Sequence, residues 1–238
     1  MTFVLVHGGG CDRRCWSRMT PHLVGPALAV DLPGRGTRPA DLDDVHLSDF
    51  VDAVVGELEQ RDLHEVVLVG HSLAGITLPG VAAAAPDRVA RLVFISCAIP
   101  PPPTSVLDCL GSFSPAAADI VDRLGPDVLT TAGTLHPDLA AAMFCNDMDE
   151  EQLAFTLGIM VPESLRVVSE PTSPTGLPPA VPCTYIRLLQ DASLTPATQT
   201  EMLSRLGDPE VIDLDAGHMA MITRPEALAA ILDGLATG

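Results

Sequence analysis

The stretch VVLVGHSLAG, residues 66–75, places a serine between two glycines at the end of an apolar run. Residues 66–71 suit a buried strand and its exit, and the LAGITLPGVAAAAP that follows Ser72 is typical of a packed helix. A strand that turns directly into a helix around a serine motif of the G-x-S-x-G type, here GHSLAG at 70–75, is the nucleophile-elbow pattern. Gly70 and Gly75 leave room for such a strained turn, so we predict that Ser72 is an exposed nucleophile.

Size and composition set the class of protein. The chain has 238 residues, of which 47% are hydrophobic, which suits one domain with a sizeable core, or one domain with an inserted subdomain. Its apolar runs are all shorter than the roughly 20 residues of a membrane helix. The start, MTFVLVHGGG, lacks the basic region of a signal peptide and enters a strand at once. We therefore expect a cytoplasmic protein without membrane association.

The charge balance excludes several function classes. The formal net charge is −18, and all 13 basic residues are arginines. Nucleic acids and anionic membranes both require a basic face, so neither is an expected partner. The lack of lysine excludes Schiff-base chemistry, lysine general bases and the P-loop lysine. We expect a small-molecule substrate and a monomer or homodimer.

The six cysteines are scattered along the sequence. A cytosolic chain would keep them reduced. Cys11 and Cys15 have C-x3-C spacing, but a zinc site would need a second pair or a histidine cluster, and the sequence offers neither. We expect neither a metal nor an organic cofactor.

Short apolar runs alternate with helical patterns along most of the chain. We expect strands at Phe3–Val6, Ala27–Val30, Val66–Val69, Arg91–Ile95, Cys183–Leu188 and Glu210–Leu214. We expect helices at Cys15–Val24, Ser48–Arg61, Ala74–Ala85, Thr195–Arg205 and Arg224–Leu235. This alternation predicts an α/β fold with a mostly parallel six-stranded sheet and helices on both faces.

One interval breaks the alternation. After Ile95, SCAIPPPPTS contains four consecutive prolines, which enforce an extended, helix-free exit. Helical patterns follow at Pro115–Leu124, Pro137–Phe144 and Asp149–Met160, without a convincing strand. We predict a helical lid at residues 99–180, inserted into a core formed by 1–98 and 181–238, because ligands of open α/β sheets bind at the carboxyl edge. The alternative is a surface excursion with no ligand role.

A serine hydroxyl needs a base, and the base needs an orienting carboxylate. The segment VIDLDAGHMAM (211–221) places His218 in a glycine-containing loop just past a strand. The segment YIRLLQDASLTP (185–196) places Asp191 just past the preceding strand, on the same sheet edge. Asp213 and Asp215 compete for the acid role but lie very near His218 in sequence. The order Ser72, Asp191, His218 is that of the α/β-hydrolases.

The first strand leads into His7-Gly8-Gly9-Gly10, where small residues let the backbone approach a ligand. We expect the N–H groups of Gly9, or alternatively Gly10, and of Leu73 to form an oxyanion hole. The residues after Gly10 do not complete G-x-G-x-x-G, which argues against dinucleotide binding.

Three further polar residues flank these motifs. His7 and His71 are expected to hold loop geometry through hydrogen bonds, since His218 is better placed to transfer protons. Asp31, in AVDLPGRG, ends the second strand and is expected to fix the following turn.

Over essentially its whole length the chain resembles the α/β-hydrolases, and more narrowly the plant methylesterase and hydroxynitrile lyase family with its bacterial relatives. The stretches that carry the resemblance are FVLVHGGG (3–10), VLVGHSLAG (67–75), FCNDMDEEQLAFTLGIMVPESL (144–165) and DAGHMAMITRPEAL (215–228). The third matters most, because elbow motifs are shared by many hydrolases. The resemblance implies the same nucleophile, acid, base and oxyanion donors as the local patterns.

The chain departs from this family in two places. Met219 stands where the hydroxynitrile lyases carry a lysine that helps accept cyanide, so cyanohydrin cleavage is disfavoured, while the esterases tolerate methionine there. The segment HGGGCDRRCW (7–16) is longer than the usual loop. Its Arg13 and Arg14 either contact an anionic group of the substrate or are solvated surface residues.

We therefore expect a serine carboxylic ester hydrolase that cleaves a small to medium, mainly apolar ester, such as a methyl ester or lactone of a secondary metabolite, through an acyl-enzyme on Ser72. The residues expected to line its pocket are Gly10, Phe113, Phe144, Met148, Phe155 and Met219. The alternative for the lid side chains is a subdomain core. The alternatives for function are polyketide-type cyclisation, thioester release, acyl transfer or C–C cleavage by the same triad, or a slow-turnover ligand-binding receptor.

Overall fold

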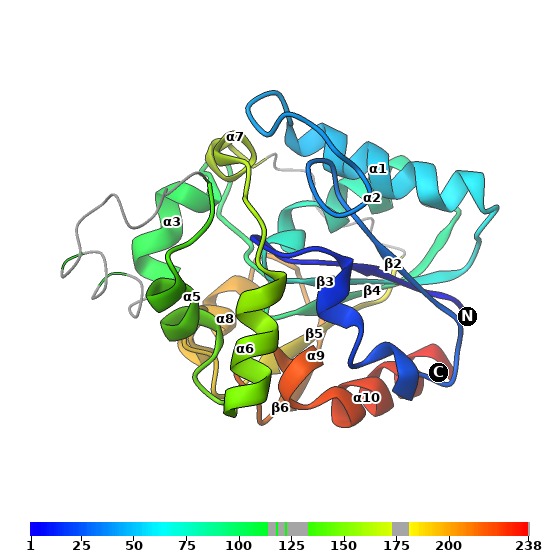
Figure 1. Cartoon of the computed structure of the whole chain (residues 1–238). Coiled ribbons are helices and arrows are strands. Elements are labelled where there is room, and N and C mark those ends of the chain that lie inside the picture. Colours follow the sequence, from blue (N-terminus) through cyan, green and yellow to red (C-terminus); the bar gives the residue numbers. More distant parts are fainter. Residues whose placement is uncertain (114–117, 119–121, 123–132, 173–180, 238) are drawn as a thin grey trace.

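A single parallel sheet organises the chain, as the computed structural model shows for residues 1–113, 118, 122, 133–172 and 181–237 (Figure 1). The strands are β1 (Phe3–Val6), β2 (Ala27–Val30), β3 (Val66–His71), β4 (Val89–Ile95), β5 (Cys183–Leu188) and β6 (Glu210–Leu214). Their spatial order is β2-β1-β3-β4-β5-β6, and every neighbouring pair is parallel. The predicted α/β fold and six-stranded sheet are confirmed.

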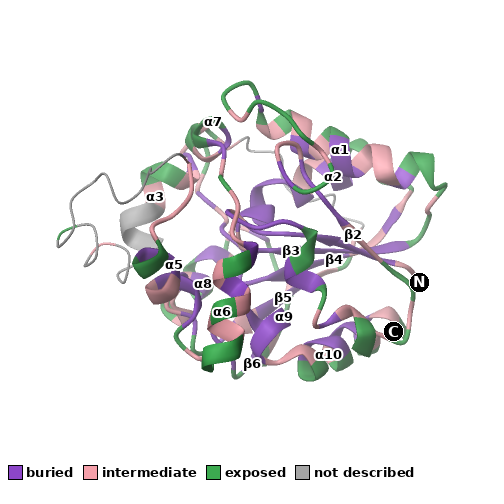
Figure 2. Cartoon of the chain, in the orientation of Figure 1, coloured by how far each residue is buried: buried purple, intermediate pink, exposed green. Residues whose placement is uncertain are grey.

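Burial explains the strand sequences. The central strand β3 is buried along its whole length, as expected for a continuous apolar run in a parallel sheet covered on both faces (Figure 2). Successive residues of β1 point to opposite faces, so that Phe3 and Leu5 join one apolar cluster while Val4 and Val6 join the other. The edge strands β2 and β6 are partly exposed.

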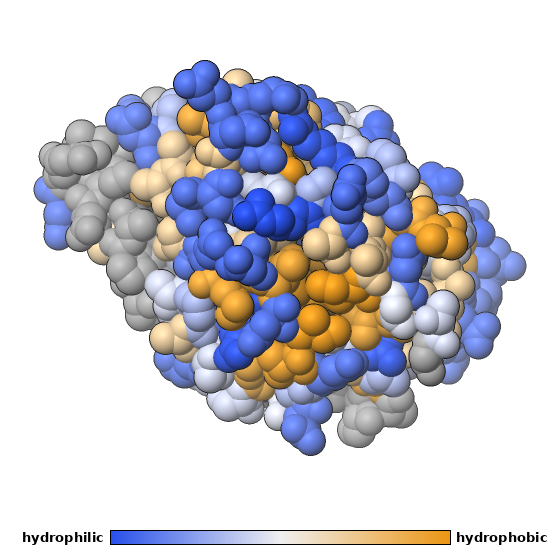
Figure 3. Space-filling model, turned by 90° about the horizontal axis from the view of Figure 1, so that it is seen from below, coloured by the Kyte–Doolittle hydropathy of each residue, from blue (hydrophilic) through white to orange (hydrophobic). Residues whose placement is uncertain are grey.

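Helices cover both faces of the sheet (Figure 1). Helices α1 (Leu47–Gln60) and α2 (Leu78–Ala84) pack together on one face. Helices α9 (Ala220–Thr223) and α10 (Pro225–Thr237) lie on the opposite face, and α8 (Pro196–Leu203) packs against β5. Seen from below, apolar residues gather on the face that carries α9 and α10 (Figure 3). Within the described part of the chain, no helix is long and apolar enough to cross a membrane.

The helix expected at Cys15–Val24 is not formed. Two short 3-10 turns stand there instead, η1 (Arg13–Trp16) and η2 (Thr20–His22). Pro21 lacks an N–H and would clash with the carbonyl of an α-helical turn before it. The N–H groups around it therefore bond to carbonyls three residues back, such as that of His22 to Met19 at 2.9 Å.

The helix after the elbow also begins with a 3-10 turn. This turn, η3 (Ser72–Ile76), precedes α2, where one helix from Ala74 was expected.

Between β4 and β5, helices gather at the carboxyl end of the strands (Figure 1). They are α3 (Val106–Phe113), α5 (Pro137–Phe144), α6 (Glu150–Ile159) and α7 (Leu165–Ser169). The expected helices α5 and α6 are present, whereas the one at Pro115–Leu124 falls largely outside the described residues. Leu139 and Met143 of α5 belong to the same apolar cluster as Phe3 of β1, so α5 packs into the core of the sheet.

Candidate active site

Ser72 stands at the turn between β3 and η3. Its φ of +52° lies in the left-handed region, which a serine adopts only where the surrounding structure imposes it. A Cβ on Gly70 would come within 2.6 Å of Leu78 Cδ1, and a Cβ on Gly75 would overlap the carbonyl oxygen of Ala98. The two glycines are therefore required for the tight elbow, and Ser72 stays partly exposed to the cavity beside it.

The expected partners of Ser72 meet it at the same edge of the sheet. His218 Nε2 lies 3.0 Å from Ser72 Oγ, within hydrogen-bond distance. His218 Nδ1 lies 2.7 Å from Asp191 Oδ2, and both side chains are almost completely buried. The acid, the base and the hydroxyl thus form one continuous chain of hydrogen bonds.

Asp191 is held by donors on both carboxylate oxygens. The backbone N–H groups of Ser193 and Leu194 donate to Oδ1 at 2.7 and 2.8 Å. The hydroxyl of Ser96 donates to Oδ2 at 2.6 Å, beside the bond from His218. Sequence reasoning missed Ser96, although its position directly after β4 places it at the same sheet edge.

Two aromatic side chains fix the His218 ring and its loop. His71 Nε2 donates to the carbonyl oxygen of His218 at 2.9 Å, and the ring of Phe144 stacks on the imidazole of His218 with centroids 5.0 Å apart. Burial, reinforced by the nearby His218, lowers the pKa of His71 well below its usual range, which keeps this donor neutral. His71 therefore has the positional role expected of it.

His7 holds the glycine loop in the same neutral manner. Its Nδ1 donates to the carbonyl of Gly8 at 2.9 Å, while its Nε2 accepts the N–H of Leu32 at 3.2 Å. Burial, assisted by the charge of Arg35, lowers the pKa of His7 to about 4. Protonation would remove the acceptor that Leu32 uses, so the bonding pattern requires the neutral ring.

The structure distinguishes the N–H groups of Gly9 and Gly10, the two candidate oxyanion donors in the glycine loop. The N–H of Gly10 donates to Glu163 Oε2 at 3.0 Å and is therefore engaged. Gly9 faces the cavity beside Ser72 and Leu73, and a Cβ on Gly9 would lie 3.2 Å from Leu73 Cδ2. This arrangement favours Gly9 over Gly10 as the oxyanion donor.

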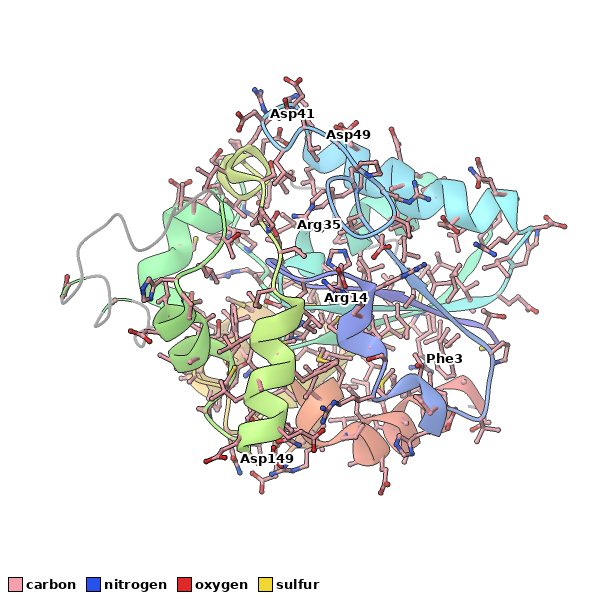
Figure 4. All side chains as sticks on the ribbon, in the orientation of Figure 1. Phe3, Arg14, Arg35, Asp41, Asp49 and Asp149 are labelled. Atoms are coloured by element: carbon pink, nitrogen blue, oxygen red, sulfur yellow. The ribbon has the colours of Figure 1, made fainter. Side chains whose placement is uncertain are left out.

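Glu163 also forms an ion pair with Arg35, which sequence reasoning missed. The Arg35 side chain is fully buried after β2, stacks over the ring of Phe50 at 4.7 Å and donates to the carbonyl of Pro33 at 2.7 Å. Burial lowers the pKa of Arg35 to about 10, so it remains charged at neutral pH. In Figure 4, Arg35 is labelled between helix α1 and Arg14.

A cavity of about 460 Å³ opens on Ser72. Its lining is mainly apolar and comes from the glycine loop, the elbow and the segment between β4 and β5. The residues of that segment in the lining are Ala98, Val106, Leu107, Gly133, Leu135, Met143, Phe144, Glu163, Leu165, Arg166, Val168 and Ser169. The loop after β5 adds Ser193 and Leu194. Gly10 and Phe144, both expected in the pocket, are part of the lining.

The structure places three other expected pocket residues elsewhere. Met148 and Phe155 pack against the core cluster below the sheet, where the Phe155 ring lies 4.4 Å from the guanidinium of Arg18. Met219 is 1% exposed and belongs to the same cluster. These positions correct the expectation. Of the three residues only Phe155 lies on α6, and helical spacing alone does not reveal which side of that helix faces the sheet. Phe113 ends α3, and its side chain lies outside the described residues.

The two arginines of the longer loop form ion pairs with carboxylates of the protein itself. Arg13 Nε lies 3.4 Å from Asp31 Oδ2, and Arg14 lies 2.8 Å from Asp12 Oδ2. Neither arginine is in the cavity lining, which favours the surface role over contact with a substrate anion. Asp31 also accepts the N–H and hydroxyl of Thr37, both at 2.9 Å, and so fixes its turn as expected.

Cys11, Cys15, Cys97, Cys145 and Cys183 are free, and burial raises the pKa of Cys11 to about 12, so it remains a thiol. Among the described residues, no three or more His, Cys, Asp or Glu side chains are arranged to hold a metal ion.

The chain is similar to known hydrolases over nearly its whole length. The family model described as "Alpha/beta hydrolase family" matches residues 3–231. Methylesterase 18 of Arabidopsis thaliana is 24% identical over 97% of this chain and 95% of its own length. Lipase LipV of Mycobacterium tuberculosis is 29% identical over 95% of this chain and 90% of its own. A solved extracellular α/β-hydrolase from a Paenibacillus species superposes with a TM-score of 0.80 at 23% identity, covering 98% and 97% of the two chains.

The chain belongs to the alpha/beta hydrolase family. Within that family, its similarity to the plant methylesterases extends over nearly the whole sequence, which confirms the resemblance identified from the motifs.

Proposed function

We propose that this protein cleaves small to medium, mainly apolar esters through an acyl-enzyme on Ser72. The observation that carries the proposal is the continuous hydrogen-bonded chain from Asp191 through His218 to the Ser72 hydroxyl, at the floor of an apolar cavity. This arrangement is the one that converts a weak serine hydroxyl into a nucleophile.

The broad class of enzyme follows from the relatives. They bear the names methylesterase, lipase and esterase, and the chain is accordingly an enzyme of the carboxylic ester hydrolase type. The serine mechanism, the lid and the choice of substrate are proposed from the geometry of this chain.

Acylation uses the three side chains in turn. Ser72 Oγ attacks the ester carbonyl while His218 Nε2 accepts its proton, and Asp191 stabilises the resulting imidazolium. The N–H groups of Gly9 and Leu73 donate to the oxyanion of the tetrahedral intermediate. His218 then returns the proton to the leaving alkoxide. In deacylation, water attacks the acyl group with His218 again as base, and Ser72 is released.

The cavity supports the choice of substrate. A volume of about 460 Å³ lies within the range of small-molecule sites, roughly 300–1,000 Å³. Its apolar lining suits an apolar acyl or alcohol group, such as a methyl ester or a lactone of a secondary metabolite. We infer that residues 99–180 act as the lid, because α3, α5 and α7 supply much of this lining.

Burst kinetics with a short-chain p-nitrophenyl ester test the proposal. We expect turnover, with or without a burst of nitrophenol, that disappears in Ser72→Ala and in His218→Ala. A folded wild-type protein that binds esters or lactones tightly without turnover would instead favour a receptor. Conversion of a substrate without water uptake would favour cyclisation, acyl transfer or C–C cleavage.

A further inference from the structure

We propose that Asn146 and Asp147, two consecutive residues after α5, are positioning residues that hold the acid loop and the base loop of the triad. Asn146 Nδ2 donates to the carbonyl oxygen of Gln190 at 2.7 Å. Asp147 Oδ2 accepts the N–H of Gly217 at 2.8 Å. One short turn of the segment between β4 and β5 therefore contacts both loops.

The contacted residues directly precede the two triad members. Gln190 is followed by Asp191, and Gly217 is followed by His218. The two loops also bond to each other, since the N–H of Gln190 donates to the carbonyl of Ala216 at 2.9 Å. The turn thus contacts both loops, and the distance between these loops determines the length of the hydrogen bond between Asp191 and His218.

The packing at Gly217 shows how tightly this turn is seated. A Cβ on Gly217 would overlap the carboxylate of Asp147 and would lie 3.1 Å from Asn146 Oδ1. Only glycine lets the acidic side chain approach the base loop so closely.

The burial of Asp147 is costly, which indicates a specific role. Its side chain is 4% exposed, and Oδ1 has no hydrogen-bond partner within the described part of the chain. The nearest cation is Arg224, whose Nη1 lies 4.0 Å from Oδ2. A buried carboxylate that makes too few hydrogen bonds destabilises a fold. The hydrogen bond from the Gly217 N–H to Asp147 offsets only part of that destabilisation.

The same turn continues from Phe144, whose ring stacks on His218. Residues 144–147 therefore fix the imidazole by its face and by its loop. In the proposed esterase mechanism, on which this inference rests, a small shift of the loop would lengthen the bond of 3.0 Å between His218 Nε2 and Ser72 Oγ.

The test compares Asp147→Ala with Asp147→Asn and with Asp149→Ala as a matched control. Asp149, at the start of α6 (Figure 4), accepts the N–H of Gln152 at 2.8 Å and caps that helix without a recorded bond to either loop. For Asp147→Ala we expect kcat to fall by roughly 10- to 100-fold with KM nearly unchanged, because misplaced groups slow the chemical step more than binding. Asp147→Asn, which keeps an acceptor, should retain most of kcat, and Asp149→Ala should keep all of it.

A spectroscopic readout makes the test independent of turnover. The Nδ1 proton of His218, shared with Asp191, gives a far-downfield NMR resonance that should shift or broaden in Asp147→Ala and remain in Asp149→Ala. Asn146 is exposed, so Asn146→Ala should fold and show the same loss if Asp147→Ala does not fold. Wild-type kcat and an unmoved resonance in Asp147→Ala or Asn146→Ala would overturn the inference. A moved resonance in a protein whose wild type does not turn over esters would uphold the positioning role and reject the esterase proposal.

Discussion

Hydrogen bonds connect Ser72 through His218 to Asp191, and the proposed reactivity of Ser72 depends on them. Within the described part of the chain, the carboxylate receives four donors, of which two are the side chains of Ser96 and His218. Three donors besides the imidazole hold the carboxylate in place, so the orientation of His218 is set before a substrate arrives.

Replacing Ser96 tests this arrangement at the level of one hydroxyl. We expect Ser96→Ala to lower kcat/KM by roughly 10- to 100-fold, because a hydrogen bond to a charged group contributes roughly 1.5–3 kcal/mol. Steady-state kinetics with one ester would measure it. Ser204→Ala is the control, since the Ser204 hydroxyl donates to the carbonyl of Glu201 and is not in the cavity lining, so this variant should keep wild-type activity. Equal activities of the two variants would show that Ser96 has no orienting role.

The neutral His7 predicts a pH-dependent stability. Its pKa is about 4 in the folded protein and 6.5 in the unfolded chain, so the unfolded chain binds more protons between these values. The free energy of unfolding should therefore fall as the pH is lowered from about 6.5 to about 4, by about 3 kcal/mol from this residue.

Urea unfolding of the wild type and His7→Asn across this range would measure the effect. Asparagine does not titrate, so the difference between the two proteins isolates the histidine from the acidic residues that also titrate. Parallel pH profiles would contradict the proposed neutral state.

At the scale of elements, the segment after α6 and the glycine loop after β1 are joined as one unit. The N–H of Val161 donates to the carbonyl of Gly10 at 2.9 Å, and the N–H of Gly10 donates to Glu163. The buried Arg35 then anchors Glu163 from the loop after β2. Three segments far apart in sequence therefore fix the loop that carries the proposed oxyanion donor.

Breaking this ion pair should destabilise the protein strongly. We expect Glu163→Ala to lower the free energy of unfolding by roughly 3–5 kcal/mol, because it leaves the charge of Arg35 buried without its partner. The double variant Glu163→Leu with Arg35→Met should recover most of that loss, since paired apolar replacement of a buried ion pair is often neutral. Urea unfolding at pH 7 would compare them, and a single variant as stable as the wild type would refute the anchoring role.

Local signals explain which elements were predictable. Short apolar runs between helical patterns predicted all six strands. Helices α3 and α7 were missed, although Ser105 and Ser164 cap them. In α3 the capping pair is Ser105 with Asp108, and this pattern was missed because it closely follows the four prolines. By contrast, the bond from Asn146 to Gln190 joins residues 44 positions apart, and no local pattern encodes such a contact.

At the scale of the whole molecule, the triad was predictable because a parallel sheet places all its carboxyl ends at one edge. Ser72, Asp191 and His218 each follow a different strand, so this rule alone predicts that they lie at the same edge of the sheet. The cavity was not predictable in the same way, because its lining combines residues from the sheet edge with several helices. Phe155 of α6 and Met148, which precedes that helix, illustrate the limit, since both pack against the core.

The mouth of the cavity predicts a preference for acyl length. Leu107 of α3 and Leu165 of α7 line the cavity while remaining 45% and 49% exposed. We expect Leu165→Ala to raise KM for a hexanoyl ester by roughly fivefold and to leave an acetyl ester unaffected, because a contact of this size contributes about 1 kcal/mol. Leu189→Ala removes a similarly exposed leucine outside the cavity and serves as the control. Equal effects on both esters would place the acyl chain elsewhere.

The most direct test of the central claim is to trap the covalent intermediate. The wild-type protein would be mixed with p-nitrophenyl acetate, quenched in acid within its first turnovers, and analysed by intact and peptide mass spectrometry. The account predicts one added acetyl group on the peptide that contains Ser72, absent in Ser72→Ala. Turnover with no adduct, or with the acetyl group on another residue, would contradict the acyl-enzyme mechanism.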